Sequence, residues 1–184
     1  NGVNRPVIRK AELIDKKFGL KKDDYILFLG RLVPEKGITY LIEGFKNVKT
    51  DKKLVIAGGS SDTDEFANQL KEMAKDDDRI IFTGFVQGQL LDELYSNAYI
   101  YSLPSDLEGM PLSLLEAMSY GLPVICLDLG GPGQIVNETC GRVISTKKRT
   151  ENELIEDISD AILELSTNKH LLETLSKGAI QRSS

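Results

Sequence analysis

The sequence contains few of the residues that build disulfide frameworks, zinc sites and histidine-dependent catalysis. Its 184 residues include only two cysteines, Cys126 and Cys140, and one histidine, His170. Because the cysteines form no Cys-x-x-Cys pair, a disulfide framework or zinc ribbon is not expected, and a reducing compartment is favoured. The single histidine argues against histidine metal sites and against a Ser-His-Asp triad.

The sequence also lacks an excess of basic residues and any long apolar run. Its 23 Lys and Arg residues and 28 Asp and Glu residues give a formal net charge of −5. Nucleic-acid-binding domains normally carry a basic face, so we expect no nucleic-acid partner. No apolar run approaches the roughly 18 residues that suggest a membrane span, so we expect none. The apolar share of 41% is ordinary and predicts one folded domain with a full core.

The start of the chain is informative. It opens on the turn dipeptide Asn1-Gly2 with no initiator methionine, so we expect a piece of a longer protein. Residues 1–24 then read as a turn followed by a mostly polar helix around 10–18, which Gly19 would end.

From Tyr25 onward, short apolar runs alternate with helical patterns. Strands are expected at 25–29, 54–57, 80–83, 98–103, 124–127 and 141–144. Helices are expected at 38–48, 64–74, 90–97, 111–120, 151–166 and 170–180. Short, continuously apolar strands between helices indicate an α/β fold, in which a doubly wound parallel sheet carries helices on both faces.

In such a fold, ligands bind beyond the carboxyl ends of the strands. Glycines and small residues occupy these ends, at Gly30-Arg31, Gly58-Gly59, Gly84-Phe85, Pro104-Ser105 and Gly130-Gly131. Glycine lets the backbone approach a ligand closely, and helix N-termini attract anions. A nucleotide or phosphate site is therefore expected at this edge.

The loop after the first strand carries two cations, Arg31 and Lys36, beside the N-terminus of the next helix. Two cations there are unfavourable unless an anion such as a diphosphate binds them. The alternative is a solvated loop in which Glu35 cancels one charge, and this segment alone does not favour either interpretation. Neither Gly-x-Gly-x-x-Gly nor the P-loop pattern is present, which argues against NAD and P-loop sites.

A second group of candidate residues surrounds the helix expected at 111–120. Glu108 precedes this helix, and Glu116 lies within it among apolar residues, with no Lys or Arg three or four positions away. Because the helix is expected to be mostly buried, Glu116 needs a distant partner or a ligand such as a pair of ribose hydroxyls. The alternatives are an exposed stripe or a tertiary salt bridge. The N–H groups of Gly109, Met110 and Leu112 are candidates to face a ligand oxygen.

Four motifs occur in register with the expected strand ends. They are Gly30-Arg31…Lys36-Gly37, Pro104-Ser105-x-x-Glu108-Gly109-x-Pro111, Glu116-Ala117-Met118-x-x-Gly121-x-Pro123-Val124 and Gly130-Gly131. Together they closely resemble the C-terminal, donor-binding domain of retaining glycosyltransferases of family 4, which have the GT-B fold. The resemblance covers nearly the whole chain. It implies that residues 1–24 are an inter-domain segment, that 25–184 form a nucleotide-sugar-binding domain, and that an N-terminal acceptor domain is absent from this chain.

The resemblance also implies roles for individual residues. Arg31 and Lys36, after Gly30, would hold the donor diphosphate, and Glu116 would bind the ribose hydroxyls. Glu108 would contact the transferred sugar.

Several contacts in the resembling family are made by the backbone. The backbone of Gly109, Met110 and Leu112 would approach the diphosphate and sugar, and the backbone of Val86 would face the base. Glu108, Arg31 and Lys36 are thus the candidate catalytic residues.

The reaction implied by the resemblance moves a sugar from a nucleotide sugar to an acceptor hydroxyl with retention of configuration. No cofactor and no metal are expected. The partners would be the nucleotide-sugar donor and the absent N-terminal domain. The resemblance further suggests polysaccharide biosynthesis in the cytoplasm, with peripheral contact of the full-length enzyme at the inner face of the membrane.

Some features depart from this pattern or compete with it. Gln134 stands where the family usually has Glu, which puts a charge-dependent role there in doubt. Asp62-Thr63-Asp64 has the form of a metal motif, but we interpret it as the start of a helix. The alternative functions are a related GT-B sugar-nucleotide enzyme, an epimerase or phosphorylase, and a non-catalytic nucleotide-binding module.

Overall fold

One parallel sheet forms the centre of the molecule. The computed structural model describes residues 5–60, 64–105 and 112–184. The strands are β1 (Tyr25–Leu29), β2 (Lys53–Ala57), β3 (Ile80–Gly84), β4 (Ile100–Leu103), β5 (Val124–Leu127) and β6 (Gly141–Ile144). They lie in the order β3-β2-β1-β4-β5-β6, and every neighbouring pair is parallel. This is the doubly wound order, with its switch point between β1 and β4.

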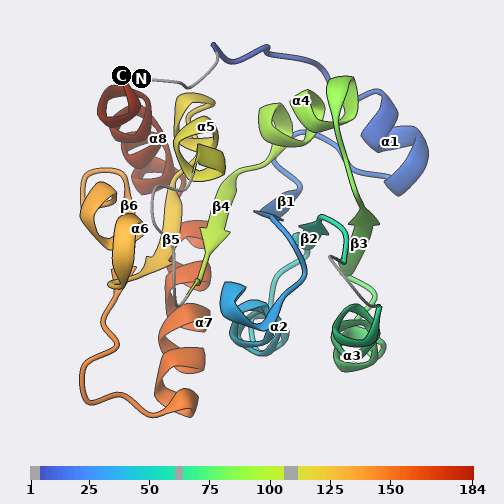
Figure 1. Cartoon of the computed structure of the whole chain (residues 1–184). Coiled ribbons are helices and arrows are strands. Elements are labelled where there is room, and N and C mark those ends of the chain that lie inside the picture. The colour runs from blue at the N-terminus through green and yellow to red at the C-terminus, as the bar shows by residue number, and fades with distance from the viewer. Residues whose placement is uncertain (1–4, 61–63, 106–111) are drawn as a thin grey trace.

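Helices cover both faces of the sheet (Figure 1). They are α1 (Leu13–Phe18), the 3₁₀ turn η1 (Pro34–Lys36), α2 (Ile38–Lys46), α3 (Glu65–Ala74), α4 (Gly88–Asn97), α5 (Leu112–Ser119), α6 (Gly130–Ile135), α7 (Glu151–Thr167) and α8 (Lys169–Ser183). In Figure 1, α2, α3 and α7 lie below the sheet, and α1, α4, α5 and α8 lie above it. The predicted fold class is therefore confirmed.

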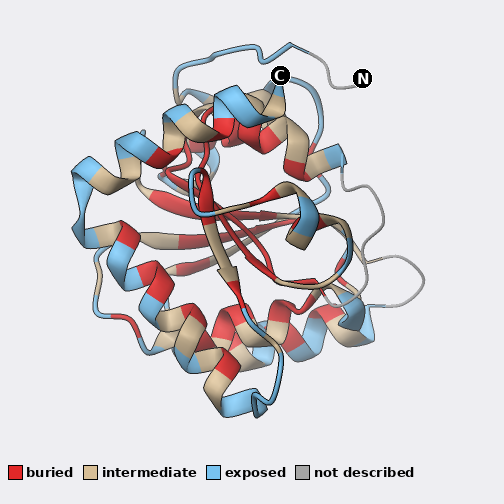
Figure 2. Ribbon diagram, turned by 90° about the vertical axis from the view of Figure 1, so that its left-hand side faces the viewer, coloured by how far each residue is buried: buried red, intermediate tan, exposed pale blue. Residues whose placement is uncertain are grey.

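The central strands are buried on both faces, as the continuous apolar runs predict. Tyr25, Ile26, Leu27 and Phe28 of β1 have no exposed surface. Figure 2 shows the strands as a buried layer between helices whose outer sides are exposed. Burial of this kind contributes about 25 cal/mol per Å² of apolar surface, so the sheet centre is the rigid part from which the strand-end loops project.

The first helix is shorter than predicted, because a side chain from another helix sets its start. The expected helix at 10–18 begins only at Leu13. The carboxylate of Glu93 on α4 accepts hydrogen bonds from the backbone N–H groups of Glu12 (2.8 Å) and Ile14 (3.2 Å). This long-range cap satisfies N–H groups that every helix start leaves unpaired. The predicted end is confirmed, since Gly19 has a φ of 66° and its N–H donates to the carbonyl of Asp15.

Two short helical elements were not predicted. Pro34–Lys36 forms a 3₁₀ turn, and Gly130–Ile135 forms α6, where the sequence was interpreted as a glycine-rich strand end. Glycine and proline normally argue against a helix, so composition hid both. In α6 the tight spacing requires glycine, because a Cβ added at Gly133 would lie 2.8 Å from the carbonyl carbon of Asp128. Tertiary packing thus overrides local propensity here.

Two further observations concern membrane-spanning helices and the two cysteines. Within the described residues, no helix is long and apolar enough to cross a membrane. Cys126 and Cys140 are both buried and free. Burial raises the pKa of the Cys126 thiol to about 12, so it behaves as a small apolar side chain in β5.

Candidate functional site

Close backbone contacts join the carboxyl ends of β1 and β2. The N–H of Gly30 donates to the carbonyl of Ala57 (3.0 Å), and the N–H of Leu32 donates to the carbonyl of Gly59 (3.1 Å). Gly58 has a φ of 145°, and a Cβ added to it would lie 1.8 Å from the carbonyl oxygen of Gly30. Only glycine fits this position, which explains why glycines gather at these two strand ends.

A second glycine brings the cation-bearing loop against the end of β4. Gly37 has a φ of 68°, and a Cβ added there would lie 1.7 Å from the carbonyl oxygen of Pro104. The hydroxyl of Ser105 donates to the carbonyl of Glu35 (3.1 Å), which fixes η1 to the same strand end. The loops after β1 and β4, which belong to two different sequence motifs, therefore meet at the switch point.

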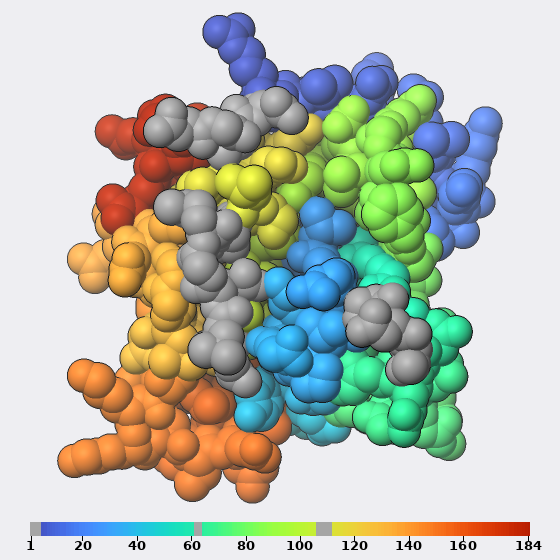
Figure 3. All heavy atoms as spheres, viewed as in Figure 1, coloured from blue at the N-terminus to red at the C-terminus, as the bar shows by residue number. Residues whose placement is uncertain are grey.

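A hollow of about 520 Å³ opens at these strand ends, and we call it the switch-point hollow. Its lining residues come from the ends of β1, β2 and β3 and from α4: Leu29, Gly30, Arg31, Gly58, Gly59, Ser60, Phe85, Val86 and Leu91. Val86 is 7% exposed, whereas Phe85 is 74% exposed at the rim. In Figure 3, the blue atoms of the chain that follows β1, α2 included, reach the surface beside α4 (green) and α3 (teal). Three predicted site residues, Gly30, Arg31 and Val86, thus share one hollow.

The charge at this hollow is positive. Arg31 is exposed, and the stem of half-buried Lys36 passes close to Gly30, since a Cβ added there would lie 3.8 Å from the Cε of Lys36. The helix that follows, α2, has no acidic residue in its first turn, so its N-terminal partial charge is not offset there. Two side-chain cations and a helix N-terminus in one place favour the binding of an anion.

The helix α5 places Glu116 beside this hollow but not in it. Glu116 lines a smaller hollow of about 290 Å³, here the Glu116 hollow, together with Arg5, Val7, Leu91, Asp92, Tyr95 and Tyr120. Leu91 lines both hollows, so they adjoin along α4. The hydroxyl of Tyr101 joins the end of β1 to α5, because it contacts the carbonyl of Leu29 (3.2 Å) and the hydroxyl of Ser113 (3.1 Å).

The expectation that α5 is buried on most sides is wrong. Leu112 is 52% exposed, and Ser113, Leu115 and Glu116 are half-buried, because α5 packs on the sheet and α8 and leaves its other side open. Glu116 makes no ion pair with any residue that the structure describes. Burial raises the pKa of the nearby Tyr95 phenol, and the charge of Glu116 adds to this shift.

Three of the predicted site residues, Glu108, Gly109 and Met110, lie outside the described residues. Leu112 is described and forms the first residue of α5. Their predicted contacts with a sugar and a diphosphate stay predictions.

The Asp-x-Asp motif is only partly described. Asp62 lies outside the described residues, and Asp64 is the residue before α3. The carboxylate of Asp64 accepts a hydrogen bond from the hydroxyl of Ser60 (2.6 Å) and makes no capping bond to the helix. Among the residues that are described, no group of three His, Cys, Asp or Glu side chains could hold a metal ion.

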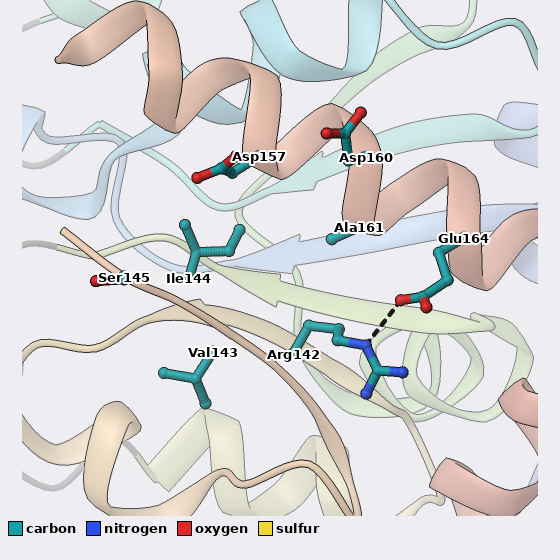
Figure 4. Close-up of a pocket in the computed structure, with 8 residues that line it drawn as sticks. All are labelled: Arg142, Val143, Ile144, Ser145, Asp157, Asp160, Ala161 and Glu164. Carbon is teal, nitrogen blue, oxygen red and sulfur yellow. Dashed lines mark hydrogen bonds and ion pairs between the residues drawn. The ribbon is translucent and has the colours of Figure 1, made fainter. Parts of the chain in front are cut away.

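A third hollow lies along the edge strand β6, between it and α7 (Figure 4). It measures about 450 Å³, and we call it the β6–α7 hollow. Figure 4 shows Glu164 on α7 pointing toward Arg142 on β6, with which it is paired at 2.7 Å, whereas Asp157 and Asp160 on the same helix point away from Arg142. It contains none of the residues predicted for the site.

Sequence reasoning missed several residues of the site. Leu91, Tyr95 and Tyr120 were interpreted as parts of ordinary amphipathic helices, and Arg5 as part of a turn. Leu91 and Tyr95 are four residues apart on α4, which is also the spacing of any buried helix face. No local signal distinguishes these residues from core residues, since only the packing of α4 against α5 brings them beside Glu116.

Fold and site together define the class of protein. A doubly wound sheet with glycine-lined strand ends, a positive switch point and a neighbouring carboxylate is the arrangement of nucleotide-binding α/β domains.

Comparison with known proteins then gives the family. The family model described as "Glycosyl transferases group 1" matches residues 10–182, so the chain belongs to this family. The putative glycosyltransferase YtcC of Bacillus subtilis (strain 168) is 33% identical over 175 residues, which cover 89% of this chain and 42% of YtcC.

Solved structures share the fold. The Anabaena protein Alr3699/HepE, solved in complex with UDP and glucose, is 17% identical with a TM-score of 0.81 over 94% of this chain and 46% of that one. The C-terminal domain of the group 1 glycosyl transferase LpcC from Francisella tularensis is 24% identical with a TM-score of 0.79, over 98% of this chain and 93% of that domain. The chain thus spans less than half the length of YtcC and HepE, and it shares its fold with nearly the whole of the LpcC domain.

Proposed function

We propose that this chain is the donor-binding domain of a retaining glycosyltransferase of family 4, which moves a sugar from a nucleotide sugar to an acceptor hydroxyl. The observation that carries the proposal is the pair of adjoining hollows at the switch point. One is lined by the exposed Arg31 and by three glycines among its residues, and the other holds a carboxylate without an ion-pair partner among the described residues. A nucleoside diphosphate has the matching parts, which are an anionic diphosphate, a ribose with two hydroxyls and a flat base.

Arg31 and Lys36 act on the diphosphate in this proposal. The difficult step of glycosyl transfer is departure of the nucleoside diphosphate, whose oxygens gain negative charge as the bond to the sugar breaks. Cations fixed beside those oxygens stabilise the charge in the transition state more than in the ground state. The N-terminus of α2 adds to the same field.

The nucleoside occupies the other side of the switch-point hollow. The base lies against Val86, which offers its backbone, and the ribose lies toward Leu91, the residue that both hollows share. Glu116 accepts hydrogen bonds from the two ribose hydroxyls. The roles of Glu108, Gly109, Met110 and Leu112 toward the sugar rest on the resemblance of their motif alone.

We further propose that an acceptor domain precedes this chain in the full-length protein. The relatives' greater length supports this, since the chain covers 42% of YtcC and 46% of HepE. A reaction between a donor and an acceptor requires both to be held in one cleft. The isolated domain is therefore expected to bind nucleotide and to transfer no sugar. Cytoplasmic location, polysaccharide assembly and peripheral membrane contact belong to the same proposal.

Two other functions make different predictions. A GT-B epimerase or phosphorylase would use the same donor pocket but yield a different product from the full-length enzyme. A non-catalytic nucleotide-binding module would bind the free nucleotide as well as any nucleotide sugar. Tighter binding of one nucleotide sugar than of its parent nucleotide favours the transferase.

A thermal-unfolding panel tests the proposal. We expect UDP, GDP, ADP or CDP, or the corresponding nucleotide sugars, to raise the melting temperature of residues 1–184, because a ligand that binds only the folded state stabilises it. EDTA should leave the shift unchanged. Arg31→Ala should reduce it, whereas Lys49→Ala, which removes an exposed positive charge far from the strand carboxyl ends, should keep it. Absence of any shift, or an equal shift for both variants, would contradict the proposal, and sugar transfer by the isolated domain would contradict the predicted need for a second domain.

A further inference from the structure

An irregular segment, residues 5–12, leads into the first helix and lies against α4 (Figure 1). We call it the entering segment. Its main anchor is Arg9, whose N–H donates to the hydroxyl of Ser96 (3.1 Å) and whose carbonyl accepts from the side-chain amide of Asn97 (3.1 Å). The guanidinium of Arg9 also pairs with Asp92 (3.1 Å). Side chains of one helix thus hold both the backbone and the side chain of a residue outside any helix or strand.

The entering segment has further anchors on either side of Arg9. Two residues earlier, the N–H of Val7 donates to the hydroxyl of Tyr120 (3.0 Å), which follows α5. The ring of Tyr120 stacks on that of Tyr95 in α4, with centroids 5.0 Å apart. Three residues later, the carboxylate of Glu93 accepts the N–H at the end of the segment, as described above. The segment is therefore bound along its length to the two helices that border the candidate site.

The entering segment also forms part of the wall of a hollow. Arg5 and Val7 line the Glu116 hollow together with residues of α4 and with Glu116 itself. The side chains that anchor the segment, Arg9 and Ser96, line neither this hollow nor the switch-point hollow. The hollow thus keeps this part of its wall only while the segment stays on α4, and the anchors can be changed without changing the lining.

We infer that the entering segment is part of the nucleotide site, in which Arg5 and Val7 close one side of the Glu116 hollow and strengthen the contact of Glu116 with the ribose. The inference rests on the proposed function, because it presumes that Glu116 binds ribose hydroxyls. A wall on this side keeps water from the carboxylate, and hydrogen bonds are stronger where water does not compete for them. Because α4 already fixes the segment, the nucleotide does not have to order it on binding.

The test compares two ligands that differ only at the ribose. One is whichever of UDP, GDP, ADP and CDP binds best, and the other is its 2′,3′-dideoxy form, which lacks both hydroxyls. The double variant Arg9→Ala with Ser96→Ala loosens the entering segment without changing the lining of either hollow. The double variant Arg5→Gly with Val7→Gly keeps the backbone hydrogen bonds but removes the lining side chains.

Each double variant should weaken binding of the ribose form about 3- to 10-fold in calorimetry, as losing the preorganisation of one or two side chains does. Binding of the dideoxy form should change little, because it lacks the hydroxyls that Glu116 binds. If the segment only supports the fold, the variant that trims Arg5 and Val7 will bind both ligands normally, and the loosened variant will affect both ligands equally.

The matched control is Arg142→Ala with Thr174→Ala. It breaks an ion pair of similar exposure, since the side chains of Arg142 and Glu164 are 29% and 47% exposed and those of Arg9 and Asp92 are 41% and 27% exposed. It also removes a hydroxyl on α8 that bonds to a backbone carbonyl. This variant should bind both ligands like the original protein, and thermal unfolding of all variants shows whether the fold is kept.

Hydrogen exchange reads the entering segment directly. If the segment raises nucleotide affinity, the bound nucleotide must stabilise the segment by the same factor. Exchange of the Arg9 amide should therefore slow about 3- to 10-fold with saturating nucleoside diphosphate. The control is the amide of Thr139, which also donates to a side chain, that of Asn137 (2.9 Å), at the opposite edge of the sheet. Its exchange should not change.

The outcomes are distinguishable. If the original protein binds none of the four nucleoside diphosphates, the proposed function is wrong and the inference falls with it. If it binds one, but both segment variants behave as the control does or weaken the two ligands equally, the inference is overturned while the proposed function stands. A selective loss for the ribose form in both segment variants supports the inference.

Discussion

The switch-point hollow and the β6–α7 hollow are similar in size but differ in whether their arginine already has an ion-pair partner in the protein. They measure about 520 and 450 Å³. In the first, Arg31 is exposed and makes no ion pair among the described residues, and three of the lining residues are glycines. In the second, Arg142 is already neutralised by Glu164 at 2.7 Å, beside two more carboxylates on α7.

The difference shows that the volume of a hollow does not identify a ligand site. Strand direction and charge do so, because ligands of doubly wound sheets bind beyond the carboxyl ends of the strands. The β6–α7 hollow lies on the side of an edge strand, and its one cation is satisfied by the protein itself. The switch-point hollow offers an exposed cation and the close approach of glycine backbone to whatever enters.

The largest expected effect comes from filling the close contact between β1 and β2. Gly58→Val would place a side chain 1.8 Å from the Gly30 carbonyl oxygen at a φ of 145°, so the loop cannot keep its path. We expect loss of nucleotide binding and a loss of several kcal/mol of stability. The control is Gly88→Ala, whose added Cβ meets nothing within 4 Å at a φ of 64°, and which should cost only about 1 kcal/mol. Urea unfolding and calorimetry measure both quantities.

Normal nucleotide binding by Gly58→Val would contradict the difference that we draw between the two hollows. The backbone approach at the switch point would then be irrelevant to the ligand, and the hollow would be no more a site than the one beside α7.

An intermediate effect is expected from Glu93, a carboxylate that serves the fold and lines neither hollow. Burial disfavours its charge, but the backbone N–H groups at the start of α1 and Gln89 outweigh this and lower its pKa. A lowered folded-state pKa adds stability above the unfolded pKa of about 4.3, and that stability is lost as the pH falls through the folded value. Glu93→Gln should therefore cost about 1–3 kcal/mol at neutral pH and progressively less toward about pH 3.

Thermal unfolding across this pH range measures the Glu93 effect. Glu156→Gln, an exposed carboxylate on α7, is the control and should change stability little at any pH. A cost for Glu93→Gln that is constant with pH would show that its charge plays no part in capping α1.

The smallest effect is expected in the β6–α7 hollow. Glu164→Gln breaks the ion pair with Arg142, but both side chains are partly exposed, at 47% and 29%. Such pairs contribute about 0–1 kcal/mol, so stability should fall slightly and nucleotide affinity should not change. A clear loss of nucleotide affinity in calorimetry would mean that this hollow belongs to the ligand site after all.

The layered fold could be predicted from the sequence because it depends on short-range patterns. Continuous apolar runs such as 25–29 and 124–127 gave the strands to within about two residues, in keeping with how sharply buried strands are bounded. The α6 helix could not be predicted, since Gly130 and Pro132 disfavour helices and only packing against Asp128 selects this conformation.

Part of the candidate site could likewise be predicted from the sequence, and part could not. The placement of Gly30, Arg31 and Lys36 at one edge could be predicted, because strand polarity brings loop residues to that edge of the sheet. The surroundings of Glu116 could not, because Tyr95 and Leu91 approach it through helix packing, which no sequence spacing encodes.

The most direct test of the central claim is a calorimetric titration of the best-binding nucleoside diphosphate into three proteins: the original chain, Arg31→Ala and Arg142→Ala. Each variant removes one arginine from one of the two hollows of similar size. We predict that Arg31→Ala weakens binding about 10-fold or more, as loss of a charged hydrogen bond does, and that Arg142→Ala leaves it unchanged. Unchanged binding in Arg31→Ala, or a larger loss in Arg142→Ala, would contradict the assignment of the switch-point hollow as the nucleotide site.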